Sequence, residues 1–158
     1  MILLTGSSGF IGSNLCKELN KRKISFIPAS RKKNQVNQKN FYKISDIDRN
    51  TYWINALKGC RSVIHTAARV HVMKDSSKDP LSEFRKVNVA GSINLARQCI
   101  EEGIKRFIYL STIKVNGDDT ETRKPFFYNG PTQPSDSYAI SKFEAEQELK
   151  ILCKNSNM

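Results

Sequence analysis

Tyr138 and Lys142 stand four residues apart in the stretch "SDSYAISKFEAE", which has the composition of the beginning of a helix. Residues at this spacing lie on one helix face, so both side chains would point into the same cleft. A tyrosine with its ordinary pKa of about 10 is a weak base at neutral pH, but a nearby ammonium lowers that pKa. The pair therefore indicates a proton shuttle, with an ordinary helix surface as the alternative.

Two hydroxyl side chains, Ser111 and Thr112, close the apolar run "RFIYLST". At the end of a strand, such hydroxyls can hold a substrate oxygen beside a catalytic tyrosine. We therefore group them with Tyr138 and Lys142 as the candidate catalytic residues. His65 lies on an apolar strand, where we interpret it as a packed neutral residue rather than a base.

Three glycines, Gly6, Gly9 and Gly12, occur at intervals of three residues in "TGSSGFIG", between an apolar run and a helical pattern. Glycine permits a tight turn, lets backbone N–H groups approach a phosphate and allows a helix to pack closely on a strand. The spacing differs from the G-x-G-x-x-G fingerprint, although its physical use is similar. We interpret the turn as a dinucleotide site that includes Phe10 and Ile11, with a plain structural turn as the alternative.

The end of the second apolar run reads "PASRKKN", and no carboxylate stands between Glu18 and Asp46. A dinucleotide site usually has an acidic residue there for the ribose hydroxyls, whereas Arg31 suits a 2′-phosphate. We therefore expect NAD or NADP as cofactor, with NADP favoured; solvated basic side chains are the alternative. Asp46 could accept a hydrogen bond from the adenine amino group while Ile47 packs on the ring, or Asp46 could cap a helix.

Five short apolar runs, each expected to form a strand, alternate with helical patterns. The runs cover residues 1–4, 24–29, 41–45, 62–68 and 106–112. Helices are expected from Ile11, over 46–59, from Phe84 to about Gly103, and around Tyr138, with a long loop over 116–134.

Nearly all-apolar strands that alternate with helices imply a parallel sheet covered on both faces. Short, right-handed connections predict an α/β fold with a doubly wound, Rossmann-like sheet of order 3-2-1-4-5. The ligand crevice of such a sheet lies beyond the carboxyl ends of its strands. The candidate residues named above all stand at those ends.

The composition bounds the remaining possibilities. The 158 residues fit a single domain covering 1–158, and no apolar run is long enough to cross a membrane. The N-terminus lacks the basic and apolar regions of a secretory signal, so we expect a cytoplasmic location. The four cysteines lack metal-ligand spacing, and no metal site is expected.

The net charge of +11 is concentrated locally, because nine Lys and Arg residues but only Glu18 lie between Lys17 and Lys43. We interpret this stretch mainly as a solvated basic face, with help in binding a small anion as the alternative. It lacks interleaved aromatic residues and any nucleic-acid reader motif, so nucleic acid is not expected as a partner.

Taken together, these motifs resemble the extended short-chain dehydrogenase/reductases of the NAD-dependent epimerase/dehydratase family. The resemblance rests on "TGSSGFIG", "HTAA" at 65–68, Asn88 in "VNVAG", "STIKV" at 111–115 and "YAISK" at 138–142. It covers essentially the whole chain. Within the family, the stretches "HTAARVHVM" and "STIKVNG" resemble those of the bacterial UDP-hexose 4-epimerases and 4-keto reductases of surface-polysaccharide synthesis.

The resemblance implies a Ser/Thr-Tyr-Lys site acting on a nucleotide sugar with NAD or NADP. Tyr138 would be the acid/base, and Lys142 would bind the nicotinamide ribose and lower the pKa of the tyrosine. Ala67 and Ala68 would line the cofactor crevice, and the side-chain amide of Asn88 would brace the fourth strand.

Members of the family are about twice as long, with a sixth strand and a C-terminal sugar-binding region. The chain therefore resembles the N-terminal portion of such an enzyme, with the fifth strand as an apolar edge. We expect activity to depend on further residues and the full-length protein to be a homodimer. A nicotinamide-binding module or sensor without turnover is the alternative function.

Overall fold

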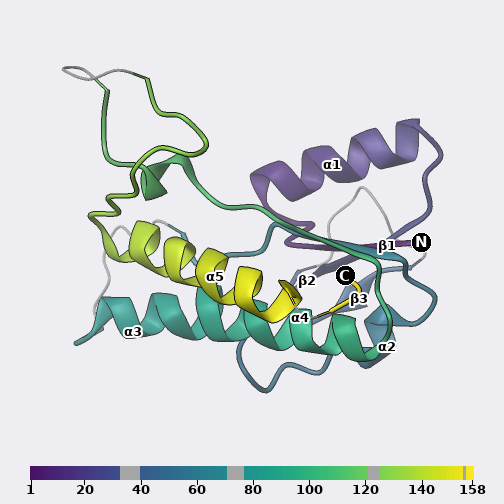
Figure 1. Cartoon of the computed structure of the whole chain (residues 1–158). Helices are drawn as coiled ribbons and strands as arrows, with labels where there is room; N and C mark the ends of the chain where they lie inside the picture. The colour runs from purple at the N-terminus through teal and green to yellow at the C-terminus, as the bar shows by residue number, and fades with distance from the viewer. Residues whose placement is uncertain (33–39, 71–76, 121–124, 155) are drawn as a thin grey trace.

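The computed structural model of the chain describes residues 1–32, 40–70, 77–120, 125–154 and 156–158 (Figure 1). Part of the loop expected over 116–134 lies outside these ranges, as do the basic residues Lys33 and Lys39.

Five parallel strands form one sheet in the predicted order β3-β2-β1-β4-β5. The strands are β1 (Ile2–Thr5), β2 (Phe26–Ser30), β3 (Tyr42–Lys43), β4 (Ser62–His65) and β5 (Arg106–Tyr109). The runs expected over 41–45, 62–68 and 106–112 are longer than these strands. Their last residues follow the final paired positions and enter the loops at the carboxyl edge of the sheet.

Helices cover both faces of the sheet. In Figure 1, α1 (Phe10–Lys21) lies on one face, while α5 (Ser137–Lys154) lies beside a continuous helical run on the other. That run joins α3 (Pro80–Arg85), a π-helical segment η1 (Lys86–Gly91) and α4 (Ser92–Glu101). The remaining elements are α2 (Ile54–Leu57) and a short 3-10 helix η2 (Ile113–Val115).

The helix expected over 46–59 is wrong for most of its length, because only α2 forms there. Asp48 accepts a hydrogen bond from the backbone N–H of Asn50, and the Thr51 hydroxyl donates to the carbonyl of Asp46. These local side-chain bonds favour a turn over a helix. The expected end at Gly59 is confirmed, since this glycine has a φ of +71°.

Successive side chains of a strand point to opposite faces of the sheet, and each face has its own apolar core. Leu3 belongs to the cluster that contains Trp53 and Leu95, whereas the next residue, Leu4, packs with Cys16 of α1 on the opposite face. Leu3, Leu4, Trp53 and Leu95 are all 0% exposed. This two-sided burial explains the nearly continuous apolar character of the strands.

The β5 strand is an edge of the described sheet and pairs only with β4. Phe107 and Tyr109 pack against the α4–α5 cluster, while Ile108 and Leu110 are 45% and 38% exposed on the other face. The expected apolar edge is confirmed. No helix in the described ranges is long and apolar enough to cross a membrane.

We predict that Gly12→Ala destabilises the chain by roughly 2 kcal/mol, because the new methyl group would overpack the turn before α1. A Cβ atom at Gly12 would lie 2.1 Å from the carbonyl oxygen of Gly6. Urea denaturation measures the loss. The exposed α1 variant Asn14→Ala is the control and should change the stability by less than about 0.5 kcal/mol. Equal effects of the two variants would contradict the prediction.

Candidate functional site

The glycine turn lies at the carboxyl end of β1 and is closely packed. Gly6 has a φ of +70°, and a Cβ atom there would come within 2.6 Å of the backbone nitrogen of Ala67. Gly9 is the N-cap of α1, no side-chain cap is seen there among the described residues, and the first turn of the helix contains no acidic residue. The turn therefore combines close backbone approach with an uncapped helix N-terminus, a combination that suits a phosphate.

Phe10 and Ile11 begin α1 and are 87% and 47% exposed. They therefore lie at the surface of the turn. Ala67 and Ala68 follow β4 and are half-buried, and the Ala67 N–H donates to the Thr5 hydroxyl at 3.4 Å. The residues that follow β1 and β4 therefore meet at one place, as the strand order predicts.

Arg31 lies one residue beyond β2 and is exposed. Asp46 is also exposed, whereas Ile47 is half-buried and packs so closely on Gly91 that a Cβ atom there would lie 2.5 Å from the Ile47 Cγ2. The alternative of a helix N-cap at Asp46 is wrong, because α2 begins eight residues later with Trp53 at its N-cap.

His65, the last residue of β4, is 1% exposed and joins β1 to α4. Its Nδ1 lies 2.7 Å from the Thr5 hydroxyl, and its Nε2 lies 3.0 Å from the Ser92 hydroxyl. Burial, together with the nearby charge of Lys142, lowers the pKa of His65 to about 3. The interpretation of His65 as a packed neutral residue is confirmed.

Asn88 lies in the π-helical segment η1, is 1% exposed and connects three parts of the chain. Its carbonyl oxygen accepts from the Arg69 N–H at 2.8 Å, and its amide donates to the Arg69 carbonyl at 3.1 Å. The same amide donates to the Ser141 hydroxyl at 2.9 Å. Asn88 therefore holds the segment after β4 against α5.

The beginning of α5 is held by Asp136. Its carboxylate accepts a hydrogen bond from the Ala139 N–H at 2.7 Å and forms an ion pair with Lys114. These contacts place Tyr138 in the first turn of α5, close to the residues that follow β5. The N-terminal cap and the ion pair thus orient the candidate base.

Tyr138 packs against Phe84, with ring centroids 6.2 Å apart. Burial raises the pKa of Tyr138, and a hydrogen bond with Thr112 acts in the opposite direction. Asp136 raises this pKa further, while Lys114 lowers it. The structure therefore brings Thr112 and Tyr138 together, as predicted.

Lys142 is 2% exposed, and its Nζ lies 3.9 Å from the centroid of the Tyr109 ring. Burial lowers the pKa of Lys142 to about 8, and Glu146 acts in the opposite direction. Lys142 is absent from the groups that lower the pKa of Tyr138, where Thr112 and Lys114 act instead. That Lys142 lowers the pKa of Tyr138 therefore stays a prediction.

Ser111 is half-buried, and its hydroxyl oxygen is shielded from solvent without a hydrogen-bond partner among the described residues. A buried hydroxyl without a partner is costly, so this group suits a ligand oxygen. His71, which follows Arg69 in the sequence and was a further candidate for approaching the substrate, lies outside the described residues.

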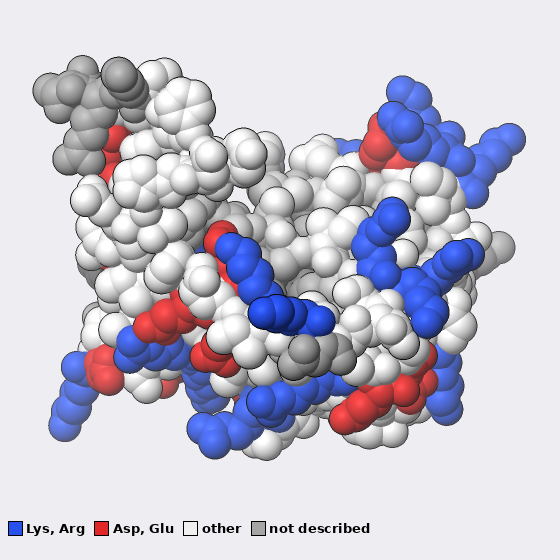
Figure 2. Space-filling view, viewed as in Figure 1, with Lys and Arg blue, Asp and Glu red and all other residues white. Residues whose placement is uncertain are grey.

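The basic residues lie partly away from the candidate site. Figure 2 shows several Lys and Arg side chains over the C-terminal end of α1, the end remote from the glycine turn. One of them, Arg22, pairs with Glu18 at 2.6 Å. The described part of this stretch favours the interpretation as a solvated basic face.

Several positioning groups were not predicted from the sequence. They are Tyr109, Ser92, Ser141 and the Lys114–Asp136 pair. Of these residues, only Tyr109 could have been suspected from the sequence, because its phenol lies on an expected strand two residues before Ser111. The others are ordinary polar residues in the sequence, and only tertiary contacts distinguish them.

Comparison with known proteins identifies the family. A family model described as the NAD dependent epimerase/dehydratase family matches residues 2–158. A UDP-glucose 4-epimerase of Vibrio cholerae is 45% identical over 99% of this chain and 48% of its own length. A dTDP-D-glucose 4,6-dehydratase of Mus musculus is 31% identical, over 92% of this chain and 44% of its own length.

Solved structures agree with the fold. The Thermus thermophilus UDP-glucose 4-epimerase in complex with NAD matches with a TM-score of 0.84 and 26% identity. The match covers 99% of this chain and 52% of the Thermus chain. The Thermotoga maritima UDP-glucose 4-epimerase with UDP-glucose has a TM-score of 0.82 and the same identity and coverage. The Thermus thermophilus structure contains NAD, and neither structure supports the expected preference for NADP.

The chain spans about half the length of the curated relatives it matches. Within that half, the glycine turn, the strand order and the Tyr-Lys helix occur together in the described fold. Because the family model matches nearly every residue, the chain belongs to the NAD dependent epimerase/dehydratase family.

Proposed function

We propose that this chain provides the cofactor-binding and acid/base part of an NAD(P)-dependent nucleotide-sugar epimerase or 4-keto reductase. The observation that carries the proposal is the meeting of Thr112 with Tyr138 at the same sheet edge as the glycine turn. The sugar part of the proposal rests on the relatives, among them the Thermotoga maritima enzyme with UDP-glucose.

The glycine turn supports the binding of a nicotinamide dinucleotide. Gly6, Gly9 and Gly12 would hold the pyrophosphate at the uncapped N-terminus of α1, with Phe10 and Ile11 beside it. When bound, the nicotinamide supplies the hydride chemistry by accepting a hydride from the sugar and returning it. The protein contributes position and electrostatics.

The adenosine end would lie over the neighbouring strand ends. Asp46 is exposed and can accept a hydrogen bond from the adenine amino group. Ile47, which packs closely on Gly91, offers an apolar surface for the adenine ring. Ala67 and Ala68 are small enough to line the crevice beside the glycine turn.

Proton transfer is assigned to Tyr138. Its phenol would exchange a proton with the sugar hydroxyl, and Ser111 and Thr112 would orient that oxygen. The buried Ser111 hydroxyl, which lacks a partner among the described residues, supports this role. Burial raises the pKa of Tyr138, so the phenol needs a nearby positive charge to act as a base at neutral pH.

Lys142 would bind the nicotinamide ribose and, with the cationic nicotinamide, supply that charge. Its position four residues after Tyr138 on α5 supports the role. Asn88 would keep the helix and the segment after β4 at a constant separation through its bonds to Arg69 and Ser141.

A cofactor-binding module without turnover is the second candidate function. It is favoured by the raised pKa of Tyr138, because burial disfavours the ionised phenol that would act as the base. The cytoplasmic location, the homodimer and the absence of nucleic-acid and membrane partners remain predictions from the sequence.

We predict that the chain binds NADH with a dissociation constant on the order of micromolar, as measured by isothermal titration calorimetry. The bound pyrophosphate adds charge-assisted contacts at the N-terminus of α1, so Gly9→Asp should abolish binding. Lys21→Gln, which lowers the charge by the same one unit at the other end of α1, is the matched control and should leave the affinity within about twofold. No binding by the unaltered chain would refute the cofactor part of the proposal.

The preference for NADP is tested by Arg31→Ala. If the guanidinium pairs with a 2′-phosphate, the variant weakens NADPH binding about tenfold but changes NADH binding less than about twofold. Calorimetry with both nucleotides measures the two losses. Equal losses, or tighter binding of NADH by the unaltered chain, would remove the 2′-phosphate role of Arg31.

Turnover is tested in a chimera in which this chain replaces the matching half of the Vibrio cholerae relative. We expect interconversion of UDP-glucose and UDP-galactose, and a loss of kcat on the order of 100-fold or more in Tyr138→Phe, because the phenol transfers the proton. The exposed Tyr128→Phe is the matched control and should retain activity. A chimera that binds NADH without converting either sugar would favour the binding module.

A further inference from the structure

The ammonium of Lys142 is buried against an aromatic ring. The residue is 2% exposed, and its Nζ lies 3.9 Å from the centroid of Tyr109, well within the range of a cation–π contact. Among the described residues, no ion pair and no hydrogen bond reaches this nitrogen. The face of the Tyr109 ring is therefore the direct contact of the buried charge.

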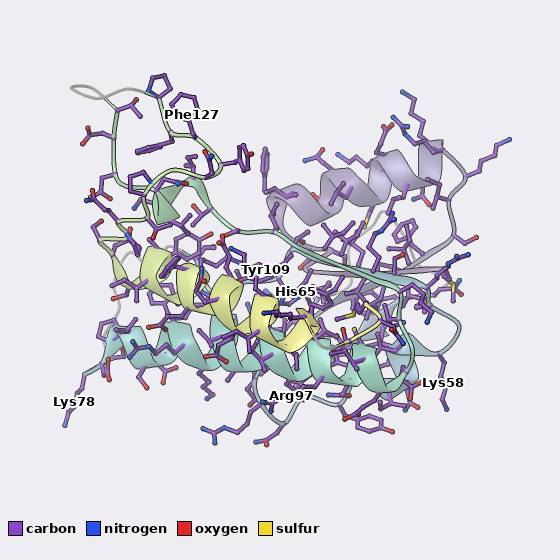
Figure 3. The ribbon with its side chains drawn as sticks, in the orientation of Figure 1. Lys58, His65, Lys78, Arg97, Tyr109 and Phe127 are labelled. Atoms are coloured by element: carbon purple, nitrogen blue, oxygen red, sulfur yellow. The ribbon has the colours of Figure 1, made fainter. Side chains whose placement is uncertain are left out.

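The Tyr109 ring is itself supported by His65. Their ring centroids lie 5.9 Å apart with an interplanar angle of 27°, and Figure 3 shows the two side chains next to each other near α5. They extend from the last residues of the paired strands β4 and β5, which are matched in register. Lys142, Tyr109 and His65 thus form a stack that runs from α5 into the sheet.

Hydrogen bonds at both ring nitrogens hold the His65 imidazole in one orientation. Its Nδ1 lies 2.7 Å from the Thr5 hydroxyl, and its Nε2 lies 3.0 Å from the Ser92 hydroxyl. In a neutral imidazole one nitrogen donates and the other accepts, and a hydroxyl can serve as the partner of either. Because the ring is neutral, it supports Tyr109 without placing a second positive charge near Lys142.

We propose that Tyr109 is a positioning residue for Lys142, with its ring face holding the ammonium in place and the hydrogen-bonded His65 imidazole holding the ring. The benefit to the cofactor site rests on the proposed function, in which Lys142 binds the nicotinamide ribose. The contact itself does not depend on any ligand.

The other titratable groups near Lys142 do not hold its ammonium in place. Glu146 follows Lys142 by one helical turn on α5 and raises its pKa, but its side chain also pairs with Lys150 at 3.9 Å. His65, on β4, is neutral. Tyr138, on α5, packs on Phe84 and has its pKa raised by burial, so it too is uncharged at neutral pH.

The test is an NMR titration of the lysine side chains in the ¹³Cε-labelled full chain, with Lys142→Met to assign the signal. Tyr109→Phe keeps the ring and should leave the pKa of Lys142 within about 0.3 of its original value. Tyr109→Leu removes the ring face and should lower that pKa by about one unit, because burial then acts on the ammonium with less opposition. Phe107→Leu removes a ring that lies on the same strand face and contacts His65, but the described cation–π contact of Lys142 is with Tyr109, so this variant should leave the pKa within about 0.3 of its original value.

A shape-preserving variant covers the case in which Tyr109→Leu does not fold. Replacing Tyr109 by 3,4,5-trifluorophenylalanine keeps the ring but weakens the negative potential of its face. We expect the pKa of Lys142 to fall by about half a unit relative to Tyr109→Phe. Identical pKa values in these two variants, or equal effects of Tyr109→Leu and Phe107→Leu, would overturn the proposal.

The titration separates this inference from the proposed function because it needs no cofactor. NADH affinity, measured in the same variants at about pH 9, should fall about tenfold where the pKa of Lys142 falls by about one unit, because above both pKa values the charged fraction of the lysine falls by that factor. A shifted pKa with unchanged NADH affinity would support the Tyr109 contact and count against the proposed role of Lys142 in binding the cofactor.

Discussion

The pairing of β1 with β4 is the contact on which the candidate site depends. In this register Thr5 lies opposite His65, and the Thr66 hydroxyl donates to the Thr5 carbonyl at 2.7 Å. Because both strands end at the same level, the turn at Gly6 meets Ala67 so closely that only glycine fits. A slip of one residue would exchange the inward and outward side chains and separate His65 from Thr5. The close packing of the turn thus follows from the register of two central strands.

Local sequence patterns were sufficient to predict the fold and the best-known parts of the site. The alternation of apolar runs and helices yields the strand order, and the spacing of Tyr138 and Lys142 places both on α5. The glycine turn and the end at Gly59 follow from backbone conformations that favour glycine. Each of these features depends on residues close together in the chain.

The features that escaped sequence analysis depend on residues far apart. Asn88 and Ser141 are separated by 53 positions, and nothing in either local pattern announces their hydrogen bond. The contact of Lys142 with Tyr109 depends on how α5 lies over β5, a result of packing rather than of periodicity. The same packing explains why the helix spacing predicted the shared face of Tyr138 and Lys142 but not the present location of the ammonium.

The burial of Lys142 makes its amine a better nucleophile but keeps reagents away from it. An amine with a pKa of about 8 is uncharged far more often at neutral pH than a surface lysine, and an uncharged amine is the nucleophile in acylation. Yet a side chain that is 2% exposed is closed to bulky reagents while α5 stays packed. The rate at which Lys142 is acylated therefore reports how often this helix opens locally, whereas the lysines on the surface react without any opening.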